Sequence, residues 1–215
     1  MSYASPLAPS RRLFVGALFA LGLPEGARAA AAPVVTVLGD SITAGFGLRA
    51  EDALPAQLQA ALRRLGVNAA VRGAGVSGDT TAGGLARLDF SVQPDTRVCV
   101  AALGGNDLLQ GLDPDTTRNN LVRLVRRLKA RRIGVVLCGL TAPRSLNAGY
   151  AREFNAVFPA VAMAEHVLLY PDLLAGVELN SRMNQRDGIH PNAAGVKLIA
   201  ARLAPVVARA LGVRT

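Results

Sequence analysis

A histidine follows an aspartate by three residues near the carboxyl end of the chain, in Asp187-Gly188-Ile189-His190. The chain contains only two histidines. Imidazole is the side chain best suited to take and give a proton near neutral pH, because its ordinary pKa is about 6.5. On a tight turn the Asp187 carboxylate can reach back to the ring, select one tautomer and stabilise the imidazolium. The pair predicts His190 as a general base that Asp187 orients.

A serine near the other end of the chain is the candidate nucleophile. Ser41 directly follows the apolar run 34–38, at a turn opened by Gly39. A hydroxyl is a weak nucleophile until a neighbouring base removes its proton, and His190 is the residue expected to do so. Together these residues predict nucleophilic attack on an acyl carbon.

Such an attack also needs hydrogen-bond donors that are fixed in advance around the oxyanion, and losing one donor costs roughly 3 kcal/mol. Three groups are candidates: the backbone N–H of Ser41, the backbone N–H of Gly78 and the side-chain amide of Asn106. Glycine at position 78 lets the main chain approach a substrate closely, and the amide at position 106 donates without adding charge. We expect these three groups to form an oxyanion hole.

Apolar runs that alternate with amphipathic stretches indicate the elements that position these residues. The expected strands are 34–38, 67–71, 98–103, 133–140 and 166–170. The expected helices are 54–65, 80–90, 116–130, 148–164 and 191–211, the last with Pro191 in its first turn. Strands that are apolar throughout and separated by helices predict an α/β fold with a parallel five-stranded sheet covered on both faces.

This fold class also predicts where a site would form. In an open α/β sheet, ligands bind in the crevice beyond the carboxyl ends of the strands. The segments that follow four of the expected strands are rich in glycine and small polar residues: 39–41, 73–79, 104–107 and 141–144. All of them should gather at one edge of the sheet. The segment 187–190 precedes the last expected helix and can return to the same edge.

Four short blocks, in this order, resemble the conserved blocks of the SGNH (GDSL-type) hydrolases. They are Gly39-Asp40-Ser41-Ile42, Ser77-Gly78-Asp79-Thr80, Gly104-Gly105-Asn106-Asp107 and Asp187-Gly188-Ile189-His190-Pro191-Asn192. The likeness covers essentially the whole chain after its N-terminal segment. It is greatest to the bacterial exported thioesterase, arylesterase and lysophospholipase branch. One departure is Gly73, which stands where the family often has an asparagine before the second block.

The resemblance implies a three-layer α/β/α fold of the flavodoxin-like type. It also implies Ser41 as nucleophile, His190 as base and Asp187 as its partner, with Gly78 and Asn106 in the oxyanion hole. The implied activity is hydrolysis of carboxylic esters or thioesters through an acyl-enzyme on Ser41, without a cofactor. Two alternatives stay open: a carbohydrate O-acetylesterase acting on cell-envelope sugars, and a non-catalytic envelope-binding module on a hydrolase scaffold.

The crevice walls are expected to decide which acyl group is accepted. They should include the segments 108–112 and 141–150, which contain several leucines. These leucines favour an ester with an apolar or aromatic acyl group over a sugar.

Other residues near the blocks have different interpretations. The run from Gly73 to Gly78 spells G-x-G-x-x-G, a fingerprint of dinucleotide sites. It follows the second expected strand instead of the first, and no acidic residue ends a strand about 20 positions later, so a dinucleotide cofactor is not expected. Asp40 and Asp79 are interpreted as fixing loops by accepting from backbone N–H groups, and Asp107 as capping a turn. The second histidine, His166, is interpreted as a surface or structural residue.

Residues 1–29 are expected to be an export signal that precedes a single domain of residues 30–215. Arg11-Arg12 form a basic start, and 13–23 form an apolar stretch too short to span a bilayer. Ala27-Arg28-Ala29 then provides a small-x-small cleavage site. The two arginines also match a twin-arginine signal, so both export routes stay open, with an uncleaved anchor as a further alternative. The protein is expected in the periplasm or outside a bacterial cell.

The net charge of +9 raises the question of anionic partners. Much of this charge lies in 121–132, where apolar residues form a helical stripe and basic residues take the opposite face. Such a face is either solvated or weakly attracted to an anionic envelope surface. Aromatic residues make up 4% of the chain and do not interleave with basic ones, which argues against a stacking platform for nucleic acid.

The two cysteines, Cys99 and Cys138, fall in expected buried strands. Cysteines inside parallel strands rarely meet the geometry of a disulfide, so we expect both to be buried thiols that act as small apolar side chains. With two cysteines, two histidines and no cluster of either, no metal site is expected.

Overall fold

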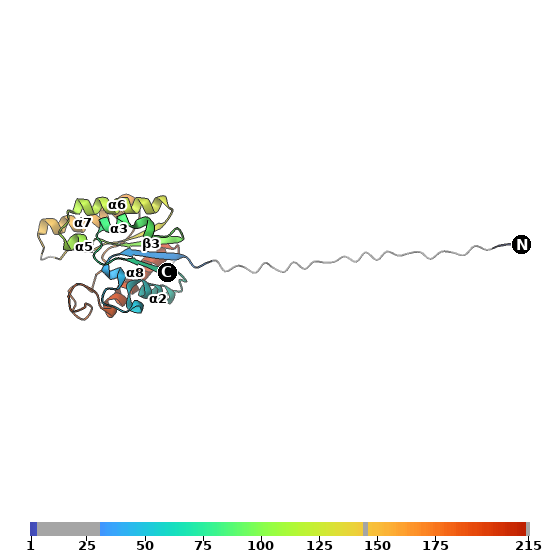
Figure 1. The fold of residues 1–215 in the computed structure, drawn as a ribbon, viewed down its shortest axis with the longest axis horizontal. Helices are drawn as coiled ribbons and strands as arrows, with labels where there is room; N and C mark the ends of the chain where they lie inside the picture. Colours follow the sequence, from blue (N-terminus) through green and yellow to red (C-terminus); the bar gives the residue numbers. More distant parts are fainter. Residues whose placement is uncertain (4–30, 144–145, 214–215) are drawn as a thin grey trace. The chain divides into compact units, whose positions relative to one another are not determined.

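Five parallel strands form one sheet in the order β2-β1-β3-β4-β5 (Figure 1). In the computed structural model, which describes residues 1–3, 31–143 and 146–213, the strands are β1 (Val34–Gly39), β2 (Ala70–Gly75), β3 (Thr96–Ala102), β4 (Gly134–Cys138) and β5 (Leu168–Tyr170). This is the flavodoxin-like order, in which β1 and β3 lie side by side where the order of the strands reverses. The prediction of an α/β fold with a parallel five-stranded sheet is confirmed. Residues 4–29 of the expected export signal, which spans 1–29, lie outside the described residues.

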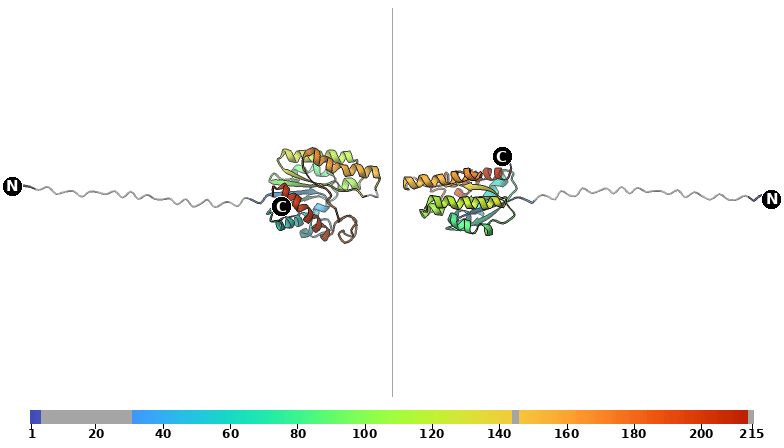
Figure 2. Two further views of the ribbon diagram at one scale, coloured as in Figure 1. Left: turned by 180° about the vertical axis from the view of Figure 1, so that it is seen from behind. Right: turned by 90° about the horizontal axis from the view of Figure 1, so that it is seen from above.

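Helices cover both faces of the sheet, which is the middle of three layers (Figures 1 and 2). On one face α2 (Leu54–Arg64) packs against α8 (Ala193–Ala210). On the other face α6 (Pro114–Ala130) packs against both α3 (Thr81–Ala86) and α7 (Ala148–Glu165). The shorter elements are α1 (Ser41–Ala44), the 3-10 turn η1 (Ala50–Asp52), α4 (Leu88–Ser91) and α5 (Gly105–Leu109). The segments after β1 and β3, expected to be loops, are therefore single helical turns.

The second strand begins three residues later than predicted. Its backbone pairs with β1 from Val34↔Ala70 to Gly39↔Gly75, whereas the apolar pattern pointed to 67–71. Val67 and Ala69 are buried, but they lie before the strand. β2 is an edge strand with no buried residue, so its bounds are set by backbone pairing with β1. A pattern of apolar residues cannot predict such bounds.

Predicted helix boundaries also differ from the structure, and two of these differences have a visible cause. The helix expected over 80–90 is divided at Arg87, which ends α3 and precedes α4. The last helix begins at Ala193 because Asn192 caps it, with its side chain accepting from the backbone N–H groups of residues 194 and 195. Pro191 therefore precedes the cap and does not lie in the first turn.

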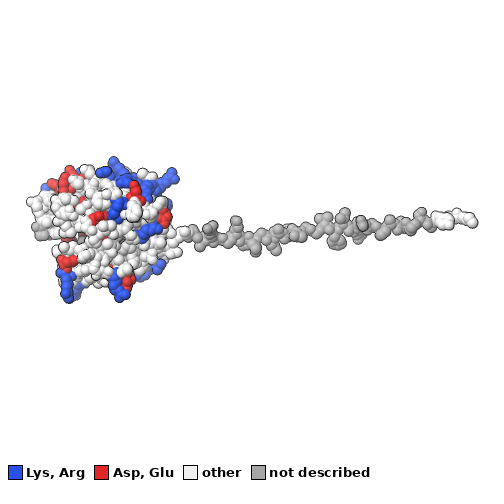
Figure 3. Space-filling view, viewed as in Figure 1, with Lys and Arg blue, Asp and Glu red and all other residues white. Residues whose placement is uncertain are grey.

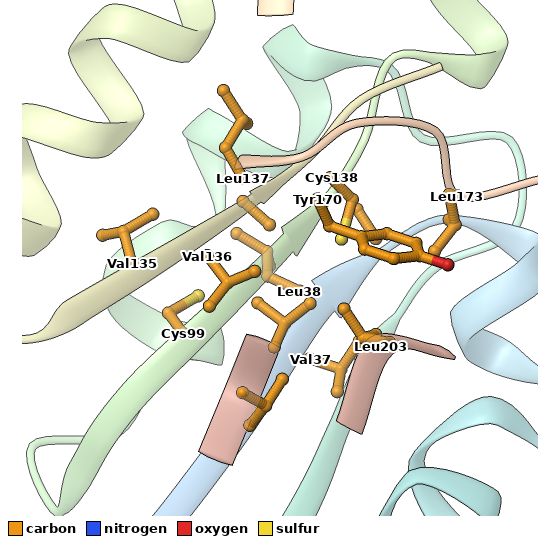
Figure 4. Packing of buried hydrophobic residues seen from close by; sticks show 14 of the residues in the cluster. Val37, Leu38, Cys99, Val135, Val136, Leu137, Cys138, Tyr170, Leu173 and Leu203 are labelled. Carbon is orange, nitrogen blue, oxygen red and sulfur yellow. The ribbon is translucent and has the colours of Figure 1, made fainter. Parts of the chain in front are cut away.

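The core lies between the sheet and its helices. Figure 4 shows Val37 of β1 beside Leu203 of α8, with Cys99 and Cys138 among the apolar side chains of β3 and β4. Both cysteines are free and buried, as expected. Burial raises the pKa of the Cys99 thiol to about 12, so this group stays protonated and packs as an apolar side chain.

Basic side chains gather along the edge of the molecule where α6 lies, interspersed with acidic ones (Figure 3). Arg126 binds the buried Glu165 carboxylate of α7 at 2.8 Å, and Lys129 donates to the Glu165 carbonyl at 2.6 Å. Arg127 pairs with Asp89 of α4. Part of the basic charge is thus paired within the fold. Within the described ranges, no helix has the length and apolarity needed to cross a bilayer.

Candidate active site

The three residues predicted to do the chemistry are in contact. Ser41 is the first residue of α1, directly beyond the carboxyl end of β1. The His190 Nε2 atom lies 2.9 Å from Ser41 Oγ, and His190 Nδ1 lies 2.6 Å from Asp187 Oδ2. To bond the carboxylate, Nδ1 must carry the proton, which leaves Nε2 free to accept from the serine hydroxyl. This is the tautomer that a general base requires.

The loop that carries His190 is held by its own backbone. The Gln185 N–H donates to the His190 carbonyl at 2.8 Å, so the chain doubles back between them. Asp187 Oδ1 accepts from the N–H groups of Ile189 at 2.9 Å and His190 at 3.0 Å. These bonds, the His190 N–H first and its ring second, lower the pKa of Asp187 to about 2. The carboxylate is therefore ionised across the neutral range.

The predicted oxyanion donors border the same cavity as Ser41. A turn closed by the Asp79 N–H donating to the Val76 carbonyl at 3.1 Å carries Gly78. Gly78 has a φ of +86°, which strongly favours glycine. The Asn106 amide donates one hydrogen to the Asp79 carbonyl at 2.8 Å and has a second one to offer. The Ser41 N–H, at the first position of α1, has no acceptor within that helix.

Close backbone contact joins the segment that leads to Gly78 to the segment that carries Ser41. A Cβ atom on Gly75 would lie 2.3 Å from the Ala44 nitrogen and 2.8 Å from the Asp40 carbonyl oxygen, so only glycine allows β2 to lie this close to α1. A Cβ on Gly73 would lie 2.8 Å from Pro55 Cγ. The packing of α2 against β2 thus gives a physical reason for glycine at this departure from the family pattern.

The aspartates of the blocks fix loops, but not all in the predicted way. Asp40 caps α1, with Oδ1 accepting from the Ile42 N–H at 3.0 Å, as expected. The Asp79 carboxylate instead binds the Arg87 guanidinium at 2.5 Å, which is an ion pair between side chains and not a bond to the backbone. Asp107 is fully buried and binds both the N–H and the hydroxyl of Thr81, at 2.8 and 2.5 Å. It therefore joins α5 to α3 and does not cap a turn of its own.

A cavity of about 490 Å³ opens at Ser41 and His190 and is lined mainly by apolar side chains. The predicted walls contribute Leu108, Leu109, Thr141 and Pro143. A third wall was not predicted, and it consists of Leu173, Leu174 and Leu179, from the segment after β5. These leucines follow the shortest strand and belong to no sequence motif, so their spacing did not identify them as cavity residues.

Phe46 and Gln185 were also missed. The Phe46 ring lies 4.6 Å from the His190 ring, centroid to centroid, at a tilt of 35°. The Gln185 amide donates to the Phe46 carbonyl at 2.8 Å and to the Pro191 carbonyl at 3.0 Å. These contacts hold the histidine loop against the end of α1. Among the described residues, no group of three His, Cys, Asp or Glu side chains forms a candidate metal site.

Burial of Asp40 gives a test of the site's electrostatics. Desolvation raises the pKa of this carboxyl to about 6, above the value of 3.8 that it has when exposed. Between these two pH values the unfolded chain loses the proton and the folded chain keeps it, so stability falls as pH rises and stays lowered above pH 6. We expect Asp40→Asn to remove a penalty of up to about 3 kcal/mol at pH 8 and only about 0.5 kcal/mol at pH 4.

Urea unfolding of both proteins at pH 4 and pH 8 measures this difference. The asparagine oxygen can still accept from the Ile42 N–H, so the cap of α1 is preserved. A variant that is no more stable than the parent at pH 8 contradicts the expectation.

Known proteins resemble this chain over most of its length. The sequence profile of the GDSL-like lipase/acylhydrolase family matches residues 37–198. Esterase TesA of Pseudomonas aeruginosa is 39% identical over 163 residues, covering 75% of this chain and 81% of that protein. Thioesterase 1/protease 1/lysophospholipase L1 of Escherichia coli K12 is 36% identical over 166 residues, covering 77% and 78%. The crystal structure of AlinE4, an SGNH-hydrolase family esterase, matches with a TM-score of 0.70 and 42% identity, covering 84% and 97%.

Proposed function

The chain belongs to the GDSL-like lipase/acylhydrolase family and hydrolyses carboxylic esters or thioesters, and we propose that it does so through an acyl-enzyme on Ser41. The observation that carries this proposal is the continuous series of hydrogen bonds from Ser41 Oγ through the His190 ring to Asp187. The same arrangement of hydroxyl, imidazole and carboxylate performs acyl transfer on unrelated folds.

In the first half of the reaction, Ser41 Oγ attacks the acyl carbon while its proton passes to His190 Nε2. The electron pair of the carbonyl moves to its oxygen, which the N–H groups of Ser41 and Gly78 and the Asn106 amide receive. When the tetrahedral intermediate collapses, the bond to the alcohol or thiol breaks and His190 gives that leaving group its proton. The ionised Asp187 stabilises the imidazolium between these two transfers.

In the second half, water replaces the alcohol or thiol. His190 Nε2 takes a proton from the water, whose oxygen attacks the acyl carbon of the ester on Ser41. The second tetrahedral intermediate uses the same donors. Its collapse breaks the bond to Ser41 Oγ, which recovers the proton from His190 and frees the carboxylic acid. No step requires a metal or an organic cofactor.

The substrate class follows from the cavity walls. Leucines from three segments, among them Leu108, Leu140 and Leu173, line the space beside Ser41. Burying a hydrocarbon chain against such walls contributes about 0.8 kcal/mol for each CH₂ group. We therefore propose small esters or thioesters with an apolar acyl group as substrates. The names of the Escherichia coli relative, thioesterase and lysophospholipase, fit the same class.

The site of action is a further part of the proposal. The basic start, short apolar stretch and small-x-small site within residues 1–29 support export to the periplasm or beyond, with residues 30–215 as the mature domain. Unpaired basic side chains would give at most a weak, salt-sensitive association with an anionic envelope surface.

Labelling with a fluorophosphonate tests the nucleophile. This reagent phosphonylates a serine that a neighbouring base activates, so the wild-type protein should be labelled and Ser41→Ala should not. Ser181→Ala is the matched control, because Ser181 is an exposed serine outside the cavity and its replacement should leave labelling unchanged. A folded wild-type protein that takes no label would favour the binding-module alternative.

A substrate series then separates the two enzyme alternatives. We compare p-nitrophenyl acetate with p-nitrophenyl esters of four, eight and twelve carbons, an acyl thioester, and acetylated glycans. The apolar walls predict that kcat/KM rises from the acetyl to the butyryl and octanoyl esters. Higher kcat/KM on acetylated glycans than on any of the aryl esters would instead support a carbohydrate O-acetylesterase.

A further inference from the structure

One arginine forms hydrogen bonds with both the segment that leads to Ser41 and the segments on either side of Gly78. Arg87 lies between α3 and α4, and its Nε atom donates to Asp79 Oδ2 at 2.5 Å. Its Nη1 atom donates to the Ala74 carbonyl and to Ser91 Oγ, both at 2.9 Å. Its Nη2 atom donates to the Gly39 carbonyl at 2.8 Å. Every nitrogen of the guanidinium therefore has a partner.

These acceptors belong to the two segments whose separation matters for catalysis. Gly39 ends β1, and its carbonyl also accepts from the Val76 N–H at 3.1 Å. Ala74 and Asp79 flank the turn that carries Gly78, one on each side. The strand that leads to the nucleophile and the turn that holds an oxyanion donor are thus bound to one rigid, planar group.

Arg87 acts from outside the cavity. It is absent from the residues that line the cavity, and its side chain is only 19% exposed. Asp79, its anionic partner, is 15% exposed, so the ion pair is well shielded from solvent. The Asp79 carbonyl is also the acceptor for the Asn106 amide. The position of a second oxyanion donor therefore depends on the residue that Arg87 binds.

We propose that Arg87 is a positioning residue that sets the distance between Ser41 Oγ and the oxyanion donors, Gly78 and Asn106. The inference rests on the proposed function, because it requires Ser41 as the nucleophile. Misplacing a catalytic group by about 1 Å costs on the order of 100-fold in rate. Substrate binding in the leucine-lined cavity does not depend on this distance, so the loss should fall on kcat.

Lysine cannot replace the guanidinium. An ammonium is a single point of charge with three donors, whereas Arg87 presents a fixed fork that reaches Asp79, Ala74 and Gly39 together. A lysine that pairs with Asp79 would leave the two carbonyls without this partner. Arg87→Lys should therefore keep the charge and lose part of the positioning.

The experiment compares Arg87→Ala and Arg87→Lys with Arg131→Ala. Arg131 is the matched control, because it is 26% exposed, donates to the Val92 carbonyl, lies near Asp89 and does not line the cavity. Active sites are counted with a fluorophosphonate, kcat for p-nitrophenyl butyrate is calculated per titrated site, and KM is measured in the same assay. We expect kcat to fall about 100-fold in Arg87→Ala and about 10-fold in Arg87→Lys, with KM within about threefold. The control should keep its kcat.

Two ketone inhibitors separate stabilisation of the oxyanion from binding in the cavity. In a trifluoromethyl ketone, Ser41 Oγ adds to the carbonyl carbon, its proton passes to His190, and the carbonyl oxygen becomes an oxyanion. The matching methyl ketone binds without forming this adduct. We expect Arg87→Ala to weaken inhibition by the trifluoromethyl ketone about 100-fold, which is the same factor as the fall in kcat. Inhibition by the methyl ketone should be unchanged.

The outcomes separate this inference from the proposed function. One outcome is that Arg87→Ala loses stability and titrated sites to the same extent as Arg131→Ala. If it then keeps its kcat per site and its affinity for the trifluoromethyl ketone, the positioning role alone is overturned. If Arg87→Ala does not fold, Arg87→Lys decides, and an unchanged kcat in that variant overturns the role. A wild-type protein that no fluorophosphonate labels overturns the proposed function, and this inference falls with it.

Discussion

Replacing His190 with alanine is expected to lower kcat roughly 10⁴- to 10⁶-fold on p-nitrophenyl acetate. The reason is that His190 Nε2, at 2.9 Å, is the one basic side-chain atom that forms a hydrogen bond with Ser41 Oγ among the described residues. The carboxyl of Asp40 lies nearby but caps α1 through the Ile42 N–H. Without the imidazole, neither the serine nor the attacking water loses its proton at neutral pH. Turnover is followed by release of p-nitrophenol at pH 7.5.

The second histidine provides the control. His166 is exposed at the end of α7, in the left-handed region with a φ of +52°, and it does not line the cavity. Asparagine tolerates that backbone conformation, so His166→Asn should fold normally and keep full activity. If His190→Ala retained activity within tenfold of the wild type, His190 would not be the base.

Replacing Asp187 with asparagine is expected to lower kcat by about 10⁴-fold while the loop keeps its shape. Asp187 Oδ1 accepts from the N–H groups of Ile189 and His190, and an asparagine oxygen can accept both of these bonds. Its Nδ2 group then faces His190 Nδ1 as a donor. The ring must accept there, so its proton moves to Nε2, which can no longer take the proton of Ser41.

Thermal unfolding and a pH profile accompany the kinetic measurement. Because the turn is preserved, we expect Asp187→Asn to change the melting temperature at pH 7 by no more than about 5 °C. The pKa of Asp187 is lowered to about 2, so this carboxylate stabilises the fold above pH 4 and its contribution is lost as pH falls through 2. Loss of wild-type activity between pH 8 and pH 5 therefore does not come from its protonation. A variant that keeps kcat within tenfold would rule out the orienting role.

The residues at the centre of the site could be predicted because each one has a local cause. Ser41 follows a buried strand directly, and parallel strands present their carboxyl ends at one edge. Asp187 and His190 are three residues apart, which is the spacing at which an aspartate can bond both the backbone and the ring of the histidine. Gly78 marks a turn that needs a left-handed residue. In these cases short-range chemistry and the fold class point to the same place.

The parts that could not be predicted depend on contacts between distant segments. Arg87 binds a carbonyl 48 residues away, and its neighbours in the sequence contain nothing that marks this partner. The third cavity wall, with Leu173, follows the short strand β5 and is recognised only when the cavity is seen. The shift of β2 has the same origin, because its pairing with β1 is a backbone interaction that side chains do not encode.

The order of the elements along the chain has a consequence for synthesis. Ser41 and His190 are 149 residues apart in sequence, and the histidine loop is completed only just before α8, which packs on α2. Ser41, the proposed nucleophile, is therefore synthesised long before His190, the proposed base. A nascent chain that ends ahead of residue 190 lacks the proposed base, so its Ser41 is expected to be inert in acyl-ester cleavage.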